Sequence, residues 1–155
     1  MQNKDAELMK IAVTGANGFI GSALTHKLCE KGYNVRGIVR LKEQILNRNG
    51  RFEVFAIGEI NSDTNWNDAL KKIDIVIHLA SRVHKLTDVS INPLADYRRV
   101  NTAGIQRLAE MSAGAEVKRL IFISTIKVNG EKTTGDAFSE DHTPHPQDSY
   151  AISKW

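Results

Sequence analysis

The stretch T-G-A-N-G-F-I-G at residues 14–21 decides the fold that the sequence predicts. It follows an apolar run at Met9–Val13 and opens onto an amphipathic stretch from Phe19 to Lys31. Short apolar runs are typical of buried strands, whereas apolar residues three and four apart are typical of a helix. The glycine-rich stretch therefore lies where a strand turns into a helix.

Three glycines in this stretch are spaced three residues apart. At such a position the first permits a tight turn, the second lets a pyrophosphate approach the backbone, and the third lets the helix pack closely on the strand. The free N–H groups at the helix start attract the anion without a lysine. The alternative interpretation is a plain turn. We expect a dinucleotide site with contacts from Gly15, Asn17, Gly18, Phe19, Ile20 and Gly21.

Apolar runs and helical stretches alternate along the rest of the chain, which predicts a parallel sheet covered by helices on both faces. This is an α/β fold, a Rossmann-type doubly wound parallel sheet. The expected strands are Met9–Val13, Val35–Val39, Phe52–Ile57, Ile73–Ala80 and Leu120–Ile123. The expected helices are Phe19–Lys31, Leu41–Asn49, Thr64–Lys72, Pro93–Ala113 and one that begins at Tyr150.

Residues that start and stop helices agree with this pattern. Asn92 can cap a helix with Pro93 at its first position, Gly114 follows the last turn, and Asp148 or Ser149 can cap the helix at Tyr150. The polar segment 131–148 is longer than an ordinary connection. It either lines a ligand or is a surface excursion.

Length and composition predict one domain. The chain has 155 residues, 41% of them hydrophobic, and a formal net charge of +3 with Lys and Arg scattered among acids. Scattered charge favours small anionic ligands over nucleic acid. We expect a flexible tail at 1–7 and a dinucleotide-binding domain at 8–155.

The cysteine count and the hydropathy of the chain indicate where in the cell the protein is located. Cys29 is the single cysteine, so an internal disulfide is impossible, and the charged start at residues 1–10 does not resemble a signal peptide. The apolar run 75–80 is far too short to cross a bilayer. The sequence predicts a cytoplasmic protein that does not bind membranes.

Histidines and tryptophans receive structural interpretations. The five histidines, at 26, 78, 84, 142 and 145, form no closed ligand set with the one cysteine, so we expect no metal site. His78 is interpreted as a core residue, and His142 and His145 as solvated. Trp66 and Trp155 are expected to pack.

The cofactor type depends on the end of the second strand, where folds that select NAD place an acid on the ribose. Arg40 occupies that place, and Arg36 lies on the same strand. A guanidinium suits a 2′-phosphate, so the cofactor is NAD or NADP, with NADP slightly favoured by Arg40. The alternative is that Arg40 stacks on adenine or faces solvent.

Tyr150 and Lys154 are four residues apart in Y-A-I-S-K, so they share one face of a helix. A nearby ammonium favours the phenolate and so makes a tyrosine a usable general acid and base. Alone, the spacing is also typical of an exposed helical pair. Its place after the fifth strand, where a parallel sheet presents its carboxyl edge, favours catalysis.

Taken together, these motifs make the chain resemble the extended short-chain dehydrogenase/reductases, in particular the NAD(P)-dependent nucleotide-sugar epimerases, dehydratases and reductases. The resemblance covers nearly all of residues 8–155. Three further strings carry it: H-L-A-S at 78–81, V-N-T-A-G at 100–104 and I-S-T-I-K-V-N-G at 123–130.

The resemblance implies further site residues. Thr125 would complete a catalytic triad with Tyr150 and Lys154, and Ser124 is the second choice. Asn101 would have a structural role beside the active site. The expected cofactor contacts from the family, besides those already given, are Arg40, Glu59, Ile60, Leu79, Ala80, Ser81, Asn101, Tyr150 and Lys154.

Two departures from the family pattern refine the expected reaction. Glu59 replaces the usual Asp near adenine, and its longer side chain can still accept from the amino group. Ile126 and Lys127 follow Thr125, where similar dehydratases carry Asp and Glu for eliminating water. The expected function is therefore an epimerase acting by transient hydride transfer. The alternatives are an NADPH-dependent ketosugar reductase and a non-catalytic dinucleotide-binding module.

Partners are also implied by the resemblance. The expected substrate is a UDP-linked nucleotide-sugar, and a homodimer would form through helices that include 93–113. Similar enzymes are about twice as long and add a C-terminal part that binds the nucleotide-sugar. We therefore expect a fragment that carries the cofactor half and has doubtful activity in isolation.

Overall fold

Five apolar segments form one parallel sheet in the computed structural model, which describes residues 9–41, 50–83, 90–133 and 135–155. Its strand order is β3-β2-β1-β4-β5. This confirms the Rossmann-type prediction, and the strand order reverses beside β1. The strands are β1 at Lys10–Thr14, β2 at Asn34–Val39, β3 at Phe52–Ala56, β4 at Ile75–His78 and β5 at Arg119–Phe122.

Helices follow the strands as expected, with differences in their bounds. The α-helices are α1 at Phe19–Glu30, α2 at Asn67–Leu70, α3 at Pro93–Arg98, α4 at Gly104–Gly114 and α5 at Ser149–Lys154. The expected tail at 1–7 and nearly all of the expected helix at 41–49 lie outside the described residues.

Two predicted helices differ from the structure for local reasons. Thr64 and its neighbours form a turn in which the Asn61 amide donates to the Thr64 hydroxyl, so α2 begins later than expected. It ends earlier because Lys72 takes a positive φ of 59°. The expected helix 93–113 is divided by a π-helical turn at Arg99–Ala103. Such a turn adds one residue, which hydropathy spacing does not reveal.

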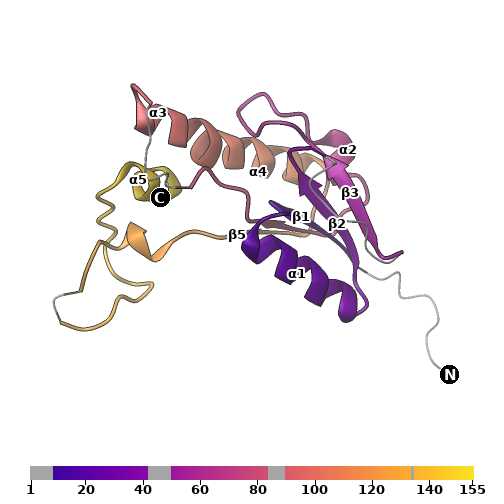
Figure 1. Ribbon diagram of the computed structural model, residues 1–155, viewed down its shortest axis with the longest axis horizontal. Coiled ribbons are helices and arrows are strands. Elements are labelled where there is room, and N and C mark those ends of the chain that lie inside the picture. The colour runs from indigo at the N-terminus through magenta and orange to yellow at the C-terminus, as the bar shows by residue number, and fades with distance from the viewer. Residues whose placement is uncertain (1–8, 42–49, 84–89, 134) are drawn as a thin grey trace.

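The helices cover the two faces of the sheet, as Figure 1 shows, with α1 on one side and α2, α3 and α4 on the other. Alternate residues of the strands face alternate sides. Ile11, Val13 and Val35 pack with Cys29 of α1. On the other face a larger buried cluster contains Ala12, Ile38, Trp66, Ala69, Leu70, Ile73, Val76 and Leu108.

The strand register determines which residues lie side by side at the carboxyl edge of the sheet. Thr14 of β1 lies beside His78 of β4, and His78 lies beside Phe122 of β5. These residues form a row at the carboxyl ends of adjacent strands. A ligand of an open α/β sheet binds beyond these ends, at the point where the strand order reverses.

The helix caps agree with those predicted from the sequence. The Asn92 side chain accepts from the Ala95 amide, and the Asp148 side chain accepts from the Ala151 amide, so both expected caps are confirmed.

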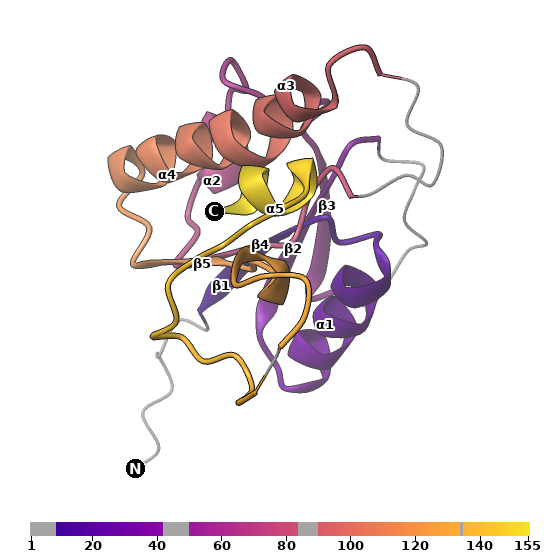
Figure 2. The ribbon, with the colours of Figure 1, turned by 90° about the vertical axis from the view of Figure 1, so that its left-hand side faces the viewer.

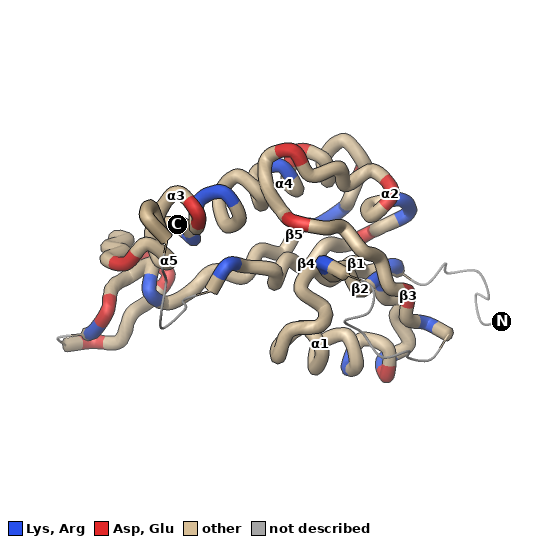
Figure 3. The backbone as a smooth tube through the Cα atoms, turned by 45° about the horizontal axis from the view of Figure 1, so that its top comes forward, with Lys and Arg blue, Asp and Glu red and all other residues tan. Residues whose placement is uncertain are grey.

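Trp66 is fully buried, whereas Trp155 is 75% exposed because it lies past α5, so its predicted packing is wrong. Figure 3 shows basic and acidic residues interspersed along the chain. None of the helices in the described ranges is long and apolar enough to span a membrane.

Candidate active site

The glycine turn joins β1 to α1 and leaves the start of α1 open. Gly15 has a φ of +66°, and its carbonyl accepts from the Gly18 amide at 2.9 Å. A Cβ atom added to Gly21 would lie 2.1 Å from the Gly15 carbonyl oxygen, and one added to Gly15 would lie 3.0 Å from the Ala80 nitrogen. Phe19 is 97% exposed. Only glycine fits this close turn, and the first turn of α1 remains accessible to an anion.

Thr14 connects the glycine turn to the segment after β4. Its Oγ1 accepts from the amides of Leu79 at 3.1 Å and Ala80 at 3.0 Å, and it lies 2.8 Å from His78 Nδ1. Two donors occupy the acceptor sites of the hydroxyl, so its proton goes to Nδ1. We infer that His78 is neutral and carries its proton on Nε2. Sequence reasoning missed this role of Thr14.

His78 is a satisfied core residue, as predicted. It is 1% exposed, and its ring stacks on Phe122 with 6.1 Å between ring centres. Burial, and then the positive charge of Lys154, lowers the pKa of His78 to about 4. The ring is therefore uncharged at neutral pH and separates the glycine turn from Lys154.

Lys154 lies at the same edge as the glycine turn. Its side chain is buried, with Nζ 4.0 Å from the centre of the Phe122 ring. Burial lowers the pKa of Lys154 to about 8, so the group is still mainly cationic at pH 7. A contact chain thus runs from Thr14 through His78 and Phe122 to Lys154. It places the glycine turn and α5 at one edge of the sheet.

Tyr150 lies in the first turn of the same short helix as Lys154, four residues earlier, so the two side chains share a face. The ring of Tyr150 makes an edge contact with Tyr97 of α3, with 6.1 Å between ring centres. Figure 2 shows α5 lying beside α3. The ring is therefore packed on one side.

Thr125 lies between two residues that contact α5. The Ser124 hydroxyl donates to the Lys154 carbonyl at 3.4 Å, and Lys127 Nζ donates to Asp148, the cap of α5. The Thr125 side chain accepts from the Lys127 amide at 3.3 Å, which leaves its hydroxyl proton for another acceptor. The residues on either side of Thr125 thus contact α5, the helix of Tyr150 and Lys154, and the second choice, Ser124, hydrogen-bonds to the helix itself.

Asn101 lies in the π-helical turn and ties two segments together. Its Oδ1 accepts from the Ser81 hydroxyl and the Arg82 amide, and its Nδ2 donates to the Arg82 carbonyl and the Ser153 hydroxyl. Thr102 beside it donates to the Ser153 carbonyl at 2.9 Å. Asn101 is 2% exposed. Its side chain serves the protein itself, and the extra residue of the π turn directs it there.

The expected adenine-side residues follow β2 and β3. Arg40 is exposed at the end of β2, and its carbonyl accepts from the Gly58 amide at 3.2 Å. Glu59 follows and is also exposed. Ile60 packs toward α4, because a Cβ added to Gly104 would lie 2.6 Å from its Cγ2. Arg40 and Glu59 are therefore near each other in the fold, whereas the Ile60 side chain belongs to the core.

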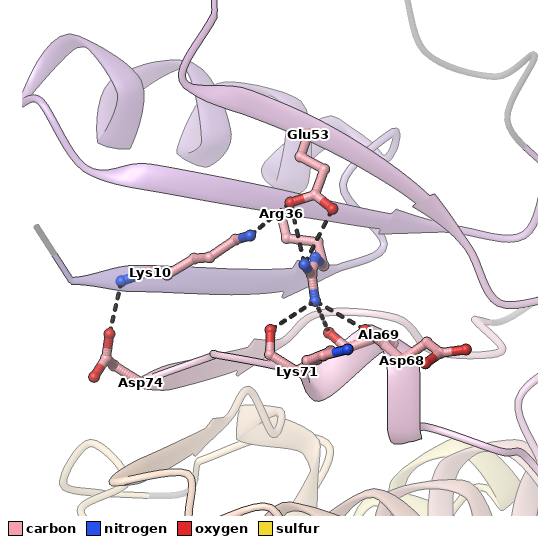
Figure 4. Close-up of polar contacts among 7 residues, drawn as sticks. All are labelled: Lys10, Arg36, Glu53, Asp68, Ala69, Lys71 and Asp74. Carbon is pink, nitrogen blue, oxygen red and sulfur yellow. Dashed lines mark hydrogen bonds and ion pairs between the residues drawn. The ribbon is translucent and has the colours of Figure 1, made fainter.

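The predicted help from Arg36 in binding a 2′-phosphate is wrong. Its guanidinium is buried, donates to the carbonyls of Asp68, Ala69 and Lys71, and pairs with Glu53 (Figure 4). Arg36 therefore fixes α2 against β2 and β3. Its strand position gave no information about these carbonyls, which belong to α2 and the residue that follows it, more than 30 residues away in the chain.

The opposite end of the sheet also has a hollow, of about 180 Å³, beside Lys10, Asn34 and Phe52. Lys10 there pairs with Glu53 at 2.7 Å. Because ligands bind beyond carboxyl ends of parallel strands, we place the candidate site at the other edge. In the described ranges, no three His, Cys, Asp or Glu side chains are arranged to hold a metal ion.

The described residues of the long segment 131–148 form no helix or strand. The Ser139 amide and hydroxyl contact exposed His142, and the His145 amide donates to the Val128 carbonyl. Exposure confirms the predicted solvation of His142 and His145. Whether the segment lines a ligand stays a prediction.

Comparisons with known proteins agree with this geometry. A family model described as the NAD dependent epimerase/dehydratase family matches residues 11–155. A UDP-glucose 4-epimerase of Vibrio cholerae is 40% identical over 93% of this chain and 43% of its own length. The ketoreductase nvfG of Aspergillus novofumigatus is 31% identical over 84% of this chain and 41% of its own length.

Solved structures are similar as well. MoeE5 in complex with UDP-glucose and NAD has a TM-score of 0.76 and 33% identity, covering 94% of this chain and 45% of that one. The chain thus spans less than half the length of each of these three proteins.

Proposed function

Because the chain belongs to the NAD-dependent epimerase/dehydratase family, we propose that it is the dinucleotide-binding and catalytic region of a nucleotide-sugar epimerase. The expected substrate is UDP-linked. One observation carries the proposal: the contacts among Thr14, His78, Phe122 and Lys154 join the glycine turn to the helix of Tyr150. The similar 4-epimerase and the UDP-glucose complex of MoeE5 support the substrate class.

The residues at this edge fit a dinucleotide. Cβ atoms at Gly15 and Gly21 would fill the space of the turn, and the exposed start of α1 offers amides and a partial positive charge to a pyrophosphate. NAD or NADP, when bound, supplies a carbon that takes up hydride and gives it back. We expect Arg40 and Glu59, which are exposed after β2 and β3, to contact the adenosine half.

The side chains would handle the proton of the substrate hydroxyl. Tyr150, as phenolate, accepts that proton while the carbon of the same carbinol loses hydride. Thr125 donates its hydroxyl proton to the substrate oxygen, because its own oxygen already accepts from the Lys127 amide. Lys154, four residues along the same helix, is cationic below its pKa of about 8 and would hold the ribose of the dinucleotide. Return of hydride to the opposite face of the carbon, with return of the proton from Tyr150 to the oxygen, would give the epimer without net oxidation.

A ketosugar reductase is the second candidate. The similar ketoreductase supports it, and so does exposed Arg40, which suits the 2′-phosphate of NADP. A reductase consumes one reduced cofactor for each product, whereas an epimerase consumes none. Measuring cofactor consumption against sugar product therefore distinguishes the two.

The test uses the intact protein that contains this chain, with Tyr150→Phe and Tyr33→Phe as the matched control far from the edge. We expect Tyr150→Phe to reduce sugar-dependent hydride transfer by about 10²–10⁴-fold, since it removes a general acid and base. Calorimetric affinity for NAD and NADP should stay unchanged. Near-normal turnover of Tyr150→Phe would reject its catalytic role. Cofactor binding by the unaltered protein without any sugar-dependent change in the nicotinamide absorbance would favour a non-catalytic binding module.

A further inference from the structure

Lys127 makes contacts in two directions from the short 3₁₀ turn Ile126–Val128 that follows Thr125. Its amide donates to the Thr125 Oγ1 at 3.3 Å. Its Nζ contacts Asp148 Oδ2 at 2.5 Å and Glu131 Oε1 at 3.2 Å. Hydrogen bonds to these two carboxylates raise the pKa of Lys127, so the side chain is cationic throughout the neutral range.

Asp148 divides its two carboxylate oxygens between Lys127 and α5. Oδ2 accepts from Lys127, and Oδ1 accepts from the Ala151 amide at 2.6 Å, which caps the helix. The helix has six residues, too few to be stable alone, so contacts at its ends determine where it lies. At the other end, Ser153 and Lys154 are held by Asn101, Thr102 and Ser124.

We propose that Lys127 is a positioning residue that fixes the first turn of α5, and with it Tyr150, relative to Thr125. The inference rests on the proposed function, in which the hydroxyls of Thr125 and Tyr150 must reach one substrate oxygen. Lys127 suits this task because its backbone contacts Thr125 while its side chain holds the cap two residues before Tyr150.

Because the Lys127–Asp148 pair is exposed to solvent, its effect on catalysis can be distinguished from its effect on folding stability. The side chains of Lys127 and Asp148 are 42% and 32% exposed, and ion pairs at such sites add little to folding stability. A displacement of catalytic groups by about 1 Å, in contrast, can reduce a rate by about 10²-fold. Loss of the pair should therefore lower kcat much more than it lowers the melting temperature.

Four variants of the intact protein test the proposal. Lys127→Met removes the cation, whereas Asp148→Asn removes the charge and keeps a good capping side chain. Lys127→Arg retains the ion pair. The double variant with both Lys127→Met and Asp148→Asn closes a thermodynamic cycle. The matched control is Lys27→Met, which breaks the exposed Lys27–Glu30 pair on α1 at 2.9 Å.

We expect Lys127→Met and Asp148→Asn each to lower kcat by about 10- to 100-fold. The double variant should fall no further, because both changes remove one interaction. Lys127→Arg should restore most of kcat. KM for the sugar, NAD affinity and the melting temperature should change little, and Lys27→Met should match the unaltered protein. An unchanged kcat in Lys127→Met, or fully multiplicative losses in the double variant, would overturn the proposal.

A second measurement does not depend on activity. Hydrogen exchange of the Ala151 amide reports how firmly Asp148 caps α5, and we expect faster exchange in Lys127→Met but not in Lys27→Met. Equal protection in Lys127→Met and the unaltered protein would overturn positioning by Lys127. An unaltered protein without turnover would instead reject the proposed function, and the exchange result would still decide the role of Lys127.

Discussion

The Nζ atom of Lys154 lies 4.0 Å from the centre of the Phe122 ring, at the same edge of the sheet as the glycine turn. A cation over an aromatic face is attracted by the ring's electrons, which offsets part of the lost hydration. Phe122 also stacks on His78, so one ring contacts two titratable groups. The aromatic ring lets a lysine and a histidine share a buried edge with only the lysine charged.

Lys154 should make folding stability depend on alkaline pH. Its pKa is lowered to about 8 from 10.5, so between these values the unfolded chain holds a proton that the folded chain lacks. The free energy of unfolding should therefore rise from pH 8 to about 10.5, by on the order of 3 kcal/mol. Chemical denaturation at several pH values checks this. Lys154→Met should lose the slope, and a slope that persists in that variant would contradict the pKa assignment.

His78 should make folding stability depend on acid pH. Burial first, and the charge of Lys154 second, lower its pKa to about 4 from 6.5, so the folded chain resists protonation. Stability should be retained above pH 6.5 and decline as the pH falls toward 4. His78→Asn keeps an acceptor for Thr14 without a titrating ring and should flatten this decline. NMR titration of Lys154→Met should show a higher His78 pKa, and an unchanged value would refute the coupling.

The Thr14 hydroxyl should matter more than its methyl group. Thr14→Val leaves the Leu79 and Ala80 amides and His78 Nδ1 without their partner, which costs about 1–3 kcal/mol for each buried group. Thr14→Ser keeps all three bonds and should lose much less stability. Urea unfolding of both variants measures the difference, and equal losses would show that the hydroxyl contributes nothing.

Gly21 should tolerate no side chain. The added Cβ of Gly21→Ala would lie 2.1 Å from the Gly15 carbonyl, and relieving that clash should cost about 1–3 kcal/mol and weaken dinucleotide binding. Gly114→Ala is the control, because no atom lies within 4 Å of its added Cβ. That change should stabilise the protein by about 0.4–1 kcal/mol. Thermal unfolding tests both, and equal stability of the two variants would argue against a tight turn.

Arg40 should set the choice between cofactors. Arg40→Ala should weaken NADP binding by about tenfold or more, the usual loss for a hydrogen bond to a charged group, and change NAD binding little. Arg119→Ala, at the opposite end of the sheet, is the control. Calorimetry with both dinucleotides measures the ratio. If both affinities fall equally, Arg40 contacts adenine and not a 2′-phosphate.

The sequence predicted those features that depend on local pattern. The glycine spacing at 15, 18 and 21, the apolar runs, and the caps Asn92 and Asp148 are encoded within a few neighbouring residues, and the structure confirms the fold they imply. The sequence also predicts that Thr125, Tyr150 and Lys154 gather at one edge, because the carboxyl ends of all five strands point the same way.

Other features depend on contacts between distant segments, so the local pattern did not predict them. Arg36 binds carbonyls of α2 and its C-cap more than 30 residues away, and Lys127 contacts Asp148 across 21 residues. The π-helical turn around Asn101 inserts one residue without disturbing the apolar spacing. Each of these features depends on tertiary packing, which the local pattern of a single sequence does not determine.

The bond between Thr14 and His78 joins residues 64 apart in the chain. Pairing between such distant strands is slow, because a long loop must close before any contact rewards it. We therefore expect the central strand to meet its second neighbour late in folding, and the glycine turn to gain its rigid wall at the same moment. A dinucleotide would then bind the finished fold and not its precursors, so the ligand should slow unfolding without speeding up the search for the native state.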